Sequence, residues 1–215
     1  MNALSISFSV LLASYLLGAI PFGVLAGKLG GVDVRSVGSG NVGTTNVWRA
    51  LGPVAGLTVF ALDVAKGAAG PLLGLWVLGK DSSWIIALCA LFAVLGHIFS
   101  IFLKFKGGKG IATGLGAMLG LWWPGALAAF AVWVVLFLVS RMVSAASIAA
   151  CIFLPLFALY LRQPAPYVLV ITVFCLVAIL KHIPNMKRIA AGTESRVSFG
   201  RKKSTVDKQT PEEKS

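Results

Sequence analysis

Long apolar runs separated by short polar segments cover most of this chain. Three of them reach or exceed the ~20 residues that a helix needs to cross a bilayer: residues 4–29, 54–78 and 84–103. Two more runs follow towards the C-terminus, at residues 144–161 and 167–180. Each run is bounded by charged residues, glycine or proline, so the pattern predicts a series of membrane-spanning helices.

A sixth run, residues 111–140, is long for one span and short for two. Inside it, Trp122-Trp123-Pro124-Gly125 places two aromatic residues of the kind found at membrane interfaces directly before a helix breaker. We therefore predict two helices here, 111–122 and 125–139. The whole pattern then predicts an all-α, polytopic integral membrane protein with seven transmembrane helices.

The basic residues support this division. With seven helices, only Lys80 and Arg162 fall on one side of the membrane, and the other side receives Lys28, Lys104, Lys106, Lys109, Arg141, Lys181, Lys187 and Arg188. A single helix over 111–140 would move Arg141 and all later basic residues except Arg162 to the opposite side. Basic residues collect on the cytoplasmic side, so we predict an N-terminus outside and a cytoplasmic C-terminus.

Composition excludes most other classes of protein. The 215 residues are 58% hydrophobic and only 12% charged, whereas soluble domains carry about 25% charged residues. A soluble enzyme, an extracellular disulfide scaffold and a disordered regulator therefore fit poorly. The net charge of +12 is explained by topology and by anionic membrane lipids, and no nucleic acid partner is expected. Cys89, Cys151 and Cys175 lie in apolar runs without metal-ligand spacing, which predicts packed free thiols.

The chain divides into one membrane domain, residues 1–195, and a tail, residues 196–215. The tail is polar and basic and lacks apolar periodicity, so we predict a disordered cytosolic segment. No basic residue precedes the first apolar run, which favours a retained helix over a cleaved signal. No internal repeat is evident, which argues against an inverted-repeat transporter.

The first of three polar segments, residues 37–49, combines glycines with small hydrogen-bonding side chains and one arginine. Glycine-rich backbone can form a nest of N–H groups for an anion, and arginine offers a bidentate fork for phosphate. An ordinary Gly/Asn turn is the alternative, and the nucleotide-binding Gly-Lys-Ser/Thr ending is absent. The candidate residues are Gly38, Ser39, Gly40, Asn41, Gly43, Thr45, Asn46 and Arg49.

The second segment, residues 104–113, leads a glycine run into a predicted helix N-terminus. Free N–H groups and the helix dipole make such a turn suitable for an anion, and Lys109 is best placed as the counter-charge. Lys104 and Lys106 are interpreted as markers of the membrane interface, and His97 as a structural, hydrogen-bonded histidine. The candidates here are Gly107, Gly108, Lys109, Gly110 and Thr113.

The third segment begins at residue 181, where the last apolar run ends. His182 and Asn185 share a face if the helix continues past Pro184; Arg188 follows, and Glu194 is predicted to form an ion pair with a basic neighbour. Ser144 and Ser147, one helical turn apart, are expected on the same side of the membrane, with helix capping the leading role for Ser144.

Two charged residues, Asp63 and Lys66, lie inside the second apolar run. They are three apart, so they can pair on one face of a helix. Charges inside a membrane are costly and are usually paired or functional. The sequence leaves two interpretations open, a pair that locks helices together or a lysine that helps to hold a substrate anion.

These segments resemble the three signature motifs of the PlsY family, the bacterial acyl-phosphate:glycerol-3-phosphate acyltransferases. The similar stretches are Gly38-Ser39-Gly40-Asn41 through Arg49, Gly96-His97 through Thr113, and Lys181-His182 through Glu194. Predicted span number, chain length and motif order are similar too, over about residues 5–195. One departure is Thr44, where the family usually has alanine.

The resemblance implies an enzyme of phospholipid biosynthesis in the bacterial cytoplasmic (inner) membrane, with its active site on the cytoplasmic face. An acyl group would pass from acyl phosphate to the sn-1 hydroxyl of glycerol 3-phosphate, giving 1-acyl-glycerol 3-phosphate (lysophosphatidate) and inorganic phosphate. No cofactor or metal is implied. The implied partners are the two substrates, membrane lipids and, functionally, the enzyme that makes acyl phosphate.

Roles for individual residues also follow from the resemblance. Catalytic roles fall to Ser39, Arg49, Lys109, His182 and Asn185. Substrate-binding roles fall to Gly38, Gly40, Asn41, Gly43, Thr45, Asn46, Lys66, Gly107, Gly108, Gly110, Thr113, Ser144, Ser147, Arg188 and Glu194. His182 or a substrate phosphate oxygen could accept the proton of the attacking hydroxyl; the resemblance favours the substrate.

Two other classes of protein use similar residues. A transporter for glycerol 3-phosphate or phosphate needs the same cations, but it usually places them near the bilayer midplane, whereas these segments are predicted at one face. A non-catalytic anchor for anionic lipids needs lysines, not ordered Gly/Ser/Asn patterns. The chain also lacks paired carboxylates for glycoside chemistry, a G-x-S-x-G nucleophile motif and a His-x4-Asp acyltransferase pattern.

Overall fold

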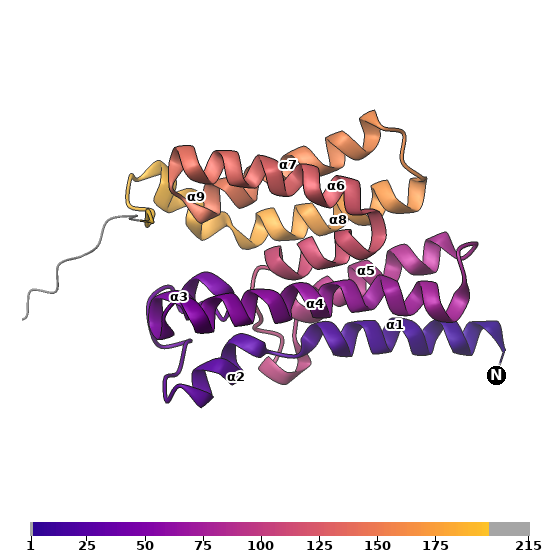
Figure 1. The fold of residues 1–215 in the computed structure, drawn as a ribbon, viewed down its shortest axis with the longest axis horizontal. Helices are drawn as coiled ribbons and strands as arrows, with labels where there is room; N and C mark the ends of the chain where they lie inside the picture. Colours follow the sequence, from indigo (N-terminus) through magenta and orange to yellow (C-terminus); the bar gives the residue numbers. More distant parts are fainter. Residues whose placement is uncertain (1, 198–215) are drawn as a thin grey trace, which may run out of the picture.

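The computed structural model describes residues 2–197, and these form a bundle of helices aligned along one long axis (Figure 1). Apolar residues fill the long helices, as a membrane-embedded bundle requires. The helices are α1 Ala3–Ala19, α2 Phe22–Leu29, α3 Thr44–Leu51, α4 Pro53–Leu78, α5 Ser83–Ile98, the 3-10 turn η1 Ile101–Leu103, α6 Ile111–Ser140, α7 Val143–Tyr160, α8 Ala165–Lys181 and α9 Ile183–Ala190.

The first apolar run is not one continuous helix, contrary to the sequence prediction for residues 4–29. Helix α1 ends at Ala19 and α2 begins at Phe22, with Pro21 as the N-cap between them. Proline has no N–H group and its ring clashes with the preceding turn, so the helix breaks here. The break leaves the carbonyl groups of Ala19 and Ile20 without helical partners, and the side chains of Ser100 and Lys66, respectively, bind them.

Helix α6 is folded back on itself at the predicted break. Trp122 leaves the helical conformation (φ −155°, ψ 78°), two residues before Pro124. A straight helix of 30 residues would be about 45 Å long. Instead, the residues that flank its two ends, Lys109 and Ser144, both belong to one cluster around Glu194. The ribbon in Figure 1 turns back at this point, so the predicted division of 111–140 is confirmed.

Five helical segments of the described residues are long and apolar enough to cross a membrane. A sixth is added if α8 and α9, which meet at a bend of 53°, count as one broken span. The prediction of an all-helical polytopic membrane protein is therefore confirmed. The kink divides α6 into two pieces that are each shorter than a typical span, so the total of seven crossings stays a prediction. The orientation of the termini also stays a prediction.

Small residues let the central helices approach closely. Gly67 of α4 lies against the Thr113 carbonyl, and Gly116 of α6 lies against the Val64 carbonyl. A methyl group at either glycine would overlap that backbone, and close contact through small residues is typical of helices packed in lipid. The three cysteines are buried and unpaired, as predicted.

A separate group of valines holds the first polar segment against the bundle. Val24 of α2, Val34, Val42, Val47 of α3 and Val59 of α4 are all buried and pack together. This small core anchors the chain on both sides of residues 37–41, so it places that segment at the end of the bundle where α4 begins.

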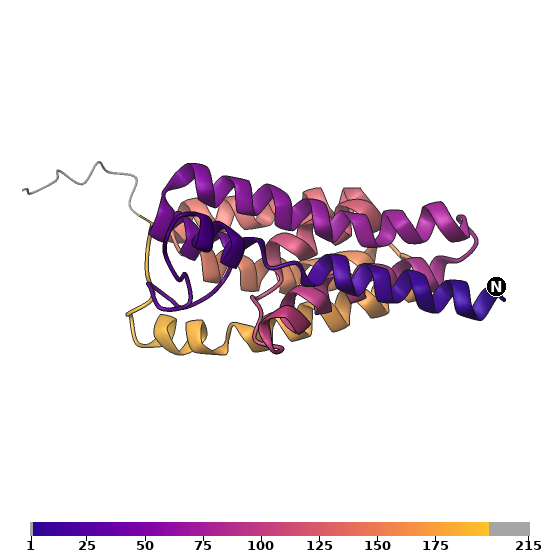
Figure 2. The ribbon, with the colours of Figure 1, turned by 90° about the horizontal axis from the view of Figure 1, so that it is seen from below.

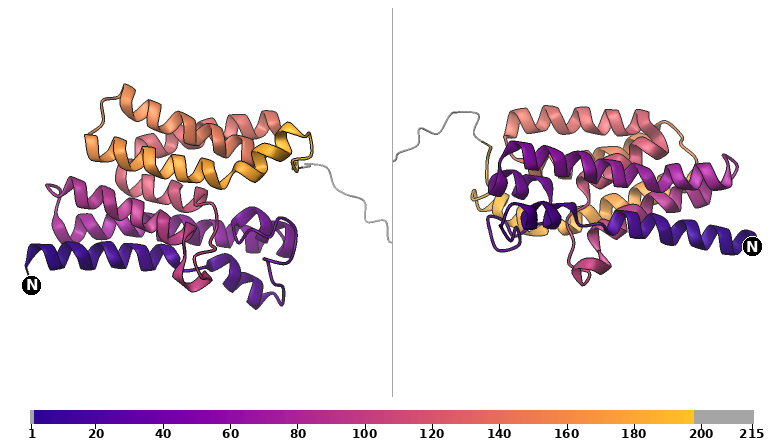
Figure 3. Two further views of the ribbon diagram at one scale, coloured as in Figure 1. Left: turned by 180° about the vertical axis from the view of Figure 1, so that it is seen from behind. Right: turned by 60° about the horizontal axis from the view of Figure 1, so that its bottom comes forward.

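The first and third polar segments lie at one end of the bundle. Figure 2 shows α3 and α9 at the end opposite the N-terminus, and both views of Figure 3 agree. The backbone N–H of Val197 donates to the Arg141 carbonyl at 2.8 Å, so the chain after α9 returns to the junction of α6 and α7. The predicted tail, residues 196–215, lies almost wholly outside the described residues.

Candidate active site

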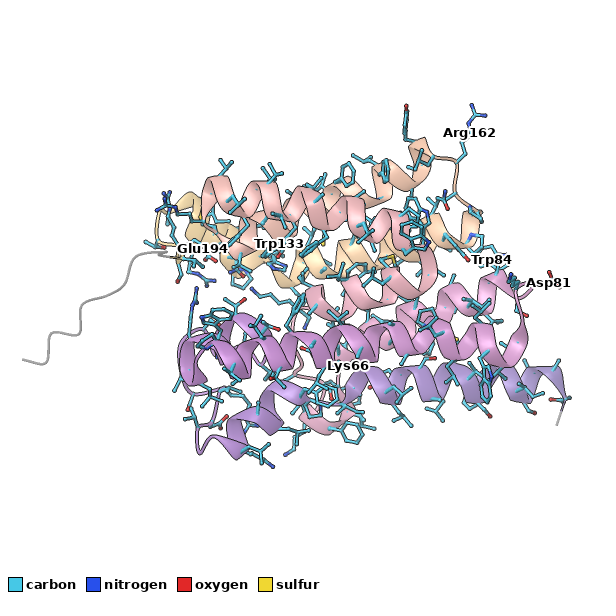
Figure 4. The ribbon with its side chains drawn as sticks, in the orientation of Figure 1. Lys66, Asp81, Trp84, Trp133, Arg162 and Glu194 are labelled. Carbon is cyan, nitrogen blue, oxygen red and sulfur yellow. The ribbon has the colours of Figure 1, made fainter. Side chains whose placement is uncertain are left out.

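The carboxylate of Glu194 is the centre of a hydrogen-bonded cluster. Its Oε1 accepts from Ser144 Oγ and from Asn185 Nδ2, each at 2.7 Å. Its Oε2 accepts from Arg188 Nε at 2.7 Å, which confirms the predicted ion pair. Three elements meet at this carboxylate: the start of α7, helix α9 and the chain after α9. Figure 4 shows Glu194 at the end of the bundle opposite Asp81 and Arg162.

Lys109 joins the second polar segment to this cluster. Its ammonium donates to Asn185 Oδ1 at 2.5 Å. Burial lowers the pKa of Lys109 to about 8; Glu194 opposes this shift, and the positive charges of Arg188 and Arg49 add to it. Arg49 of the first polar segment lies within electrostatic range of Lys109, whereas the second and third segments are joined directly by the Lys109–Asn185 hydrogen bond.

The pKa of Glu194 is lowered, although partial burial alone would raise it. The hydrogen bonds from Ser144, Asn185 and Arg188 stabilise the carboxylate more than burial destabilises it. Glu194 is therefore ionised at neutral pH. It holds Asn185 and Arg188 in fixed positions with their remaining donors available.

His182 lies at the junction of α8 and α9, one turn before Asn185. Its Nδ1 is 2.8 Å from the Ala178 carbonyl oxygen. A carbonyl oxygen only accepts, so Nδ1 carries the hydrogen and, in the neutral ring, Nε2 carries the lone pair. The His182 ring is within electrostatic range of Lys109 and Glu194.

The first polar segment is ordered by its own hydrogen bonds. Asn46 Oδ1 accepts from the Ser39 N–H at 2.9 Å, and its Nδ2 donates to the carbonyls of Val34 and Val37 at 2.7 and 3.1 Å. Gly38 has φ 59°, and a Cβ there would lie 2.4 Å from Asn46 Oδ1, so the turn needs glycine. Asn46 thus shapes the loop, and its side-chain amide is occupied by doing so.

The other glycines and polar residues of this segment lie around that turn. Gly40 also has a positive φ, and Asn41 Oδ1 accepts from the Gly43 N–H at 3.1 Å, immediately before α3 starts. Ser39 is exposed, and Thr45 opens the first turn of α3 together with Thr44. The hydroxyl of Thr44 is buried and has no hydrogen-bond partner within residues 2–197.

The second segment is fixed to the end of α5. The N–H groups of Gly107 and Gly108 donate to the carbonyls of Ile98 and His97 at 3.1 and 3.2 Å. Gly110 has φ 82° and caps α6 in a left-handed conformation that favours glycine. This turn presents Lys109 towards Asn185.

Three of the predicted site residues have no hydrogen bond or ion pair to the Glu194 cluster among the described residues. Ser147 Oγ donates to the Val143 carbonyl and accepts from Trp133 Nε1. The buried Thr113 hydroxyl has no partner among the described residues. Lys66 pairs with Asp63, as the first of the two interpretations left open by the sequence requires, and also donates to the Ile20 carbonyl. No contact in the described residues joins these three to Glu194.

The capping role predicted for Ser144 is wrong. Helix α7 begins at Val143, its N-cap is Met142, and no side chain caps it. The Ser144 hydroxyl donates to Glu194 instead.

Helices α3 and α9 were not predicted from the sequence. Both are eight residues long with one apolar side, so the helical spacing of their apolar residues was the available local signal for them.

The cluster has the chemistry of a site for a phosphate group beside apolar helices. The basic residues outnumber the carboxylate, which leaves a net positive charge for a dianion, and a guanidinium and an ammonium are strong phosphate donors. No group of three or more potential metal ligands occurs within residues 2–197. The basic residues are Lys109 and Arg188, with Arg49 within electrostatic range of Lys109.

The fold defines a helical integral membrane protein, and the candidate site is a polar cluster with excess positive charge at one end of its bundle. The chain belongs to the glycerol-3-phosphate acyltransferase family, the PlsY family, whose model matches residues 8–192. The resemblance seen in the sequence motifs is therefore confirmed.

Individual relatives support this assignment over nearly their whole length. A glycerol-3-phosphate acyltransferase of Synechococcus sp. (strain JA-3-3Ab) is 44% identical over 187 residues, 86% of this chain and 91% of that protein. One of Jannaschia sp. (strain CCS1) is 43% identical over 91% of this chain and 95% of that protein.

Two solved structures share the fold. One is the crystal structure of PlsY (YgiH), an integral membrane glycerol 3-phosphate acyltransferase, in its glycerol 3-phosphate form. It has a TM-score of 0.86 and 42% identity over 89% of this chain and 96% of that one. The lysophosphatidic acid form has a TM-score of 0.83 and 41% identity over 89% and 95% of the two chains.

Proposed function

We propose that this protein transfers an acyl group from acyl phosphate to the sn-1 hydroxyl of glycerol 3-phosphate. The products would be 1-acyl-glycerol 3-phosphate and inorganic phosphate. The observation that carries the proposal is the Lys109–Asn185–Glu194–Arg188 cluster with Arg49 in electrostatic reach. Family membership supports the acceptor, because the relatives are named for glycerol 3-phosphate.

We assign acyl phosphate as the donor because its chemistry suits a site that positions charged groups. Acyl phosphate is a mixed anhydride with phosphate as a good leaving group, so no covalent enzyme intermediate is needed. Positioning and stabilisation of developing negative charge then account for the catalysis. We assign the donor phosphate to the turns around Ser39–Gly43 and Gly107–Gly110, with the other residues of those two segments as supporting binding groups.

The acceptor is assigned to the cluster itself. Arg49, Lys109, His182 and Asn185 would surround glycerol 3-phosphate, and Glu194 would hold Asn185 and Arg188 in place. The hydroxyl proton would pass to a phosphate oxygen of the substrate; His182 Nε2, which is not engaged by Ala178, is the alternative acceptor. In both cases the attacking oxygen forms a bond to the acyl carbon as the bond to the phosphate oxygen breaks.

The proposed function also implies a membrane topology and a cellular location. We propose seven membrane crossings with the site on the cytoplasmic face of the bacterial inner membrane. The acyl chain would lie in an apolar groove between helices, open to lipid. A separate enzyme would supply the acyl phosphate.

The test uses purified full-length protein in detergent with palmitoyl phosphate and glycerol 3-phosphate. Release of phosphate together with lysophosphatidate, dependent on both substrates, supports the proposal. Palmitoyl-CoA in place of palmitoyl phosphate tests the donor, and product formed equally well from the thioester would overturn that part. A transporter or a lipid anchor would form no product in this assay, which contains no vesicles.

Alanine variants of Arg49 and Lys109 test the assignment of the acceptor site. Lys109 is partly buried and Arg49 is exposed. Losing a charge-assisted hydrogen bond to a bound phosphate costs about 1.5–3 kcal/mol, so kcat/KM for glycerol 3-phosphate is expected to fall by about tenfold or more. Lys104→Ala, at the exposed predicted interface lysine, is the matched control. Near-normal turnover and KM in both site variants would refute these roles.

A further inference from the structure

A second group of polar side chains lies inside the bundle, apart from the Glu194 cluster. Asp63 and Lys66 of α4 have side chains only 3% and 4% exposed, His97 at the end of α5 is 8% exposed, and Ser100 is 1% exposed. Lys66 lies partway along the bundle, far from the end marked by Glu194 (Figure 4). Burying charge inside a membrane protein is costly, so this group needs an explanation beyond packing.

Two of these side chains bind the carbonyl groups left free where α1 breaks. Lys66 Nζ is 2.7 Å from Asp63 Oδ1 and donates to the Ile20 carbonyl at 2.6 Å. Ser100 Oγ donates to the Ala19 carbonyl at 2.6 Å. The ammonium also lies 5.4 Å above the Phe22 ring. These contacts surround the charge of Lys66 with protein groups, so they favour the helix-locking interpretation over a direct substrate contact.

The remaining member, His97, connects this group to the turn that carries Lys109. Its Nδ1 lies 3.7 Å from Asp63 Oδ1, and its backbone carbonyl accepts the Gly108 N–H at 3.2 Å. The imidazole covers Gly108 so closely that a Cβ on that glycine would be 2.3 Å from His97 Nε2. The ring and the backbone of one residue therefore both hold Gly108, directly before Lys109.

We propose that His97 is a positioning residue for the acyl-transfer site, held by the Asp63–Lys66 pair. Its ring fixes the position of the Gly107–Gly110 turn relative to α5. That turn then fixes the position at which the Lys109 ammonium contacts Asn185. The Asp63–Lys66 pair and Ser100 fix α4 and α5 to the α1–α2 break, so the ring has a rigid support. This inference rests on the proposed function, because it assigns Lys109 to substrate binding.

A double-mutant cycle tests the packing of His97 on Gly108. In Gly108→Ala the new methyl group must displace the ring and the turn, so KM for glycerol 3-phosphate is expected to rise about tenfold or more. Adding His97→Ala removes the obstructing ring and should recover part of that loss. Gly107→Ala is the matched control: its methyl group would lie 2.0 Å from the His97 carbonyl oxygen, which His97→Ala does not remove, so no rescue is expected.

The pH profile of His97→Ala gives a second readout that does not depend on Gly108. With the ring gone, the turn loosens and water reaches Lys109, so the alkaline fall of kcat/KM should move to higher pH. Arg49, His182, Arg188 and Glu194, which also act on the charge of Lys109, are unchanged in this variant. A merely structural role would lower the yield or the melting temperature without moving the profile.

The outcomes separate this inference from the proposed function. Absence of turnover in the wild-type enzyme would overturn the proposed function. An active wild type whose Gly108→Ala loss is not relieved by His97→Ala, or is relieved no better than the Gly107→Ala loss, would overturn the positioning role. An unchanged pH profile in His97→Ala would do the same, and it decides the question if the glycine variants do not fold.

Discussion

At the scale of single residues, the site combines one carboxylate with an excess of positive charge. Glu194 accepts from Ser144, Asn185 and Arg188, and these bonds satisfy the carboxylate without neutralising Lys109 or Arg49. A dianionic phosphate can therefore enter without displacing an internal ion pair. Such preorganised donors stabilise charge at no cost of rearrangement during the reaction.

The first prediction concerns the charge of Lys109. Its pKa is lowered to about 8, chiefly by burial, so the ammonium loses its proton as pH rises through that value. Above pH 8 each further unit should lower the protonated fraction about tenfold. We expect kcat/KM for glycerol 3-phosphate to fall over this range, measured by phosphate release with the enzyme-free hydrolysis of acyl phosphate subtracted.

Lys109→Arg is the control for that profile. Arginine stays protonated in proteins, so this variant should lose the alkaline fall even if its overall rate is lower. A wild-type profile that stays flat to pH 9.5, or an Arg variant that keeps the fall, would contradict the role of Lys109.

The second prediction concerns the proton acceptor. With Nδ1 bonded to Ala178, only Nε2 of His182 can face substrate. If the substrate phosphate takes the proton, His182→Gln should keep kcat within about tenfold, since the amide still offers a hydrogen bond; loss of a general base costs about 10²–10⁴. Steady-state kinetics of the Gln and Ala variants decide this. A fall of kcat by more than about a hundredfold in both, with KM unchanged, would identify His182 as the base.

At the scale of elements, the site depends on how closely α4 and α6 pack, because α6 follows the Lys109 turn directly. In Gly116→Ala the methyl group would lie 1.9 Å from the Val64 carbonyl oxygen, and rigid backbone gives way poorly. Overpacking of this kind costs about 1–3 kcal/mol. We expect a lower melting temperature in detergent and a higher KM for glycerol 3-phosphate.

Gly114→Ala in the same helix is the matched control. There the methyl group meets the ring of Phe174, and a side chain can rotate away more readily than a carbonyl. The loss should therefore be smaller than in Gly116→Ala. Equal losses in the two variants would show that α4–α6 contact is not what limits stability.

The sequence pattern predicted the helices that lie in long apolar runs and missed the short amphipathic helices. Apolar runs identified α4, α5 and α7, and Trp122–Pro124 identified the fold in α6, because a proline after interfacial aromatics ends a helix. Pro21 is also a helix breaker, but it lies inside an uninterrupted apolar run without interfacial aromatics before it, and the prediction treated that run as one helix. Helices α3 and α9 span two turns each, too few for periodicity to stand out.

The candidate site was predictable for a physical reason. Glycines, hydroxyls and basic residues in three polar segments on one side of a membrane have few partners except one another and a ligand. That reasoning led to Lys109, Asn185, Arg188 and Glu194, which the structure brings into one cluster. It did not reveal that Ser144 binds Glu194 or that His97 covers Gly108, because those contacts depend on tertiary packing that spacing along the chain does not encode.

At the scale of the whole molecule, the remaining question is how often the chain crosses the membrane and in which direction. Asp81 and Arg162 lie at one end of the bundle and Glu194 at the other (Figure 4). Between Asp81 and Arg162 the chain passes through α5, α6 and α7. If the folded α6 crosses twice, both residues face the same side of the membrane; if it crosses once, they face opposite sides.

Single cysteines at these positions test both points in spheroplasts of the expression host. With seven crossings and an outside N-terminus, Asp81→Cys and Arg162→Cys should react with a membrane-impermeant maleimide. Lys106→Cys and Lys187→Cys should react only after permeabilisation. The three native cysteines are buried, so the wild type serves as a low background. Labelling of positions 81 and 162 from opposite sides would exclude a double crossing by α6, and reaction of 106 and 187 in intact spheroplasts would invert the orientation and place the acyl-transfer site on the outer face.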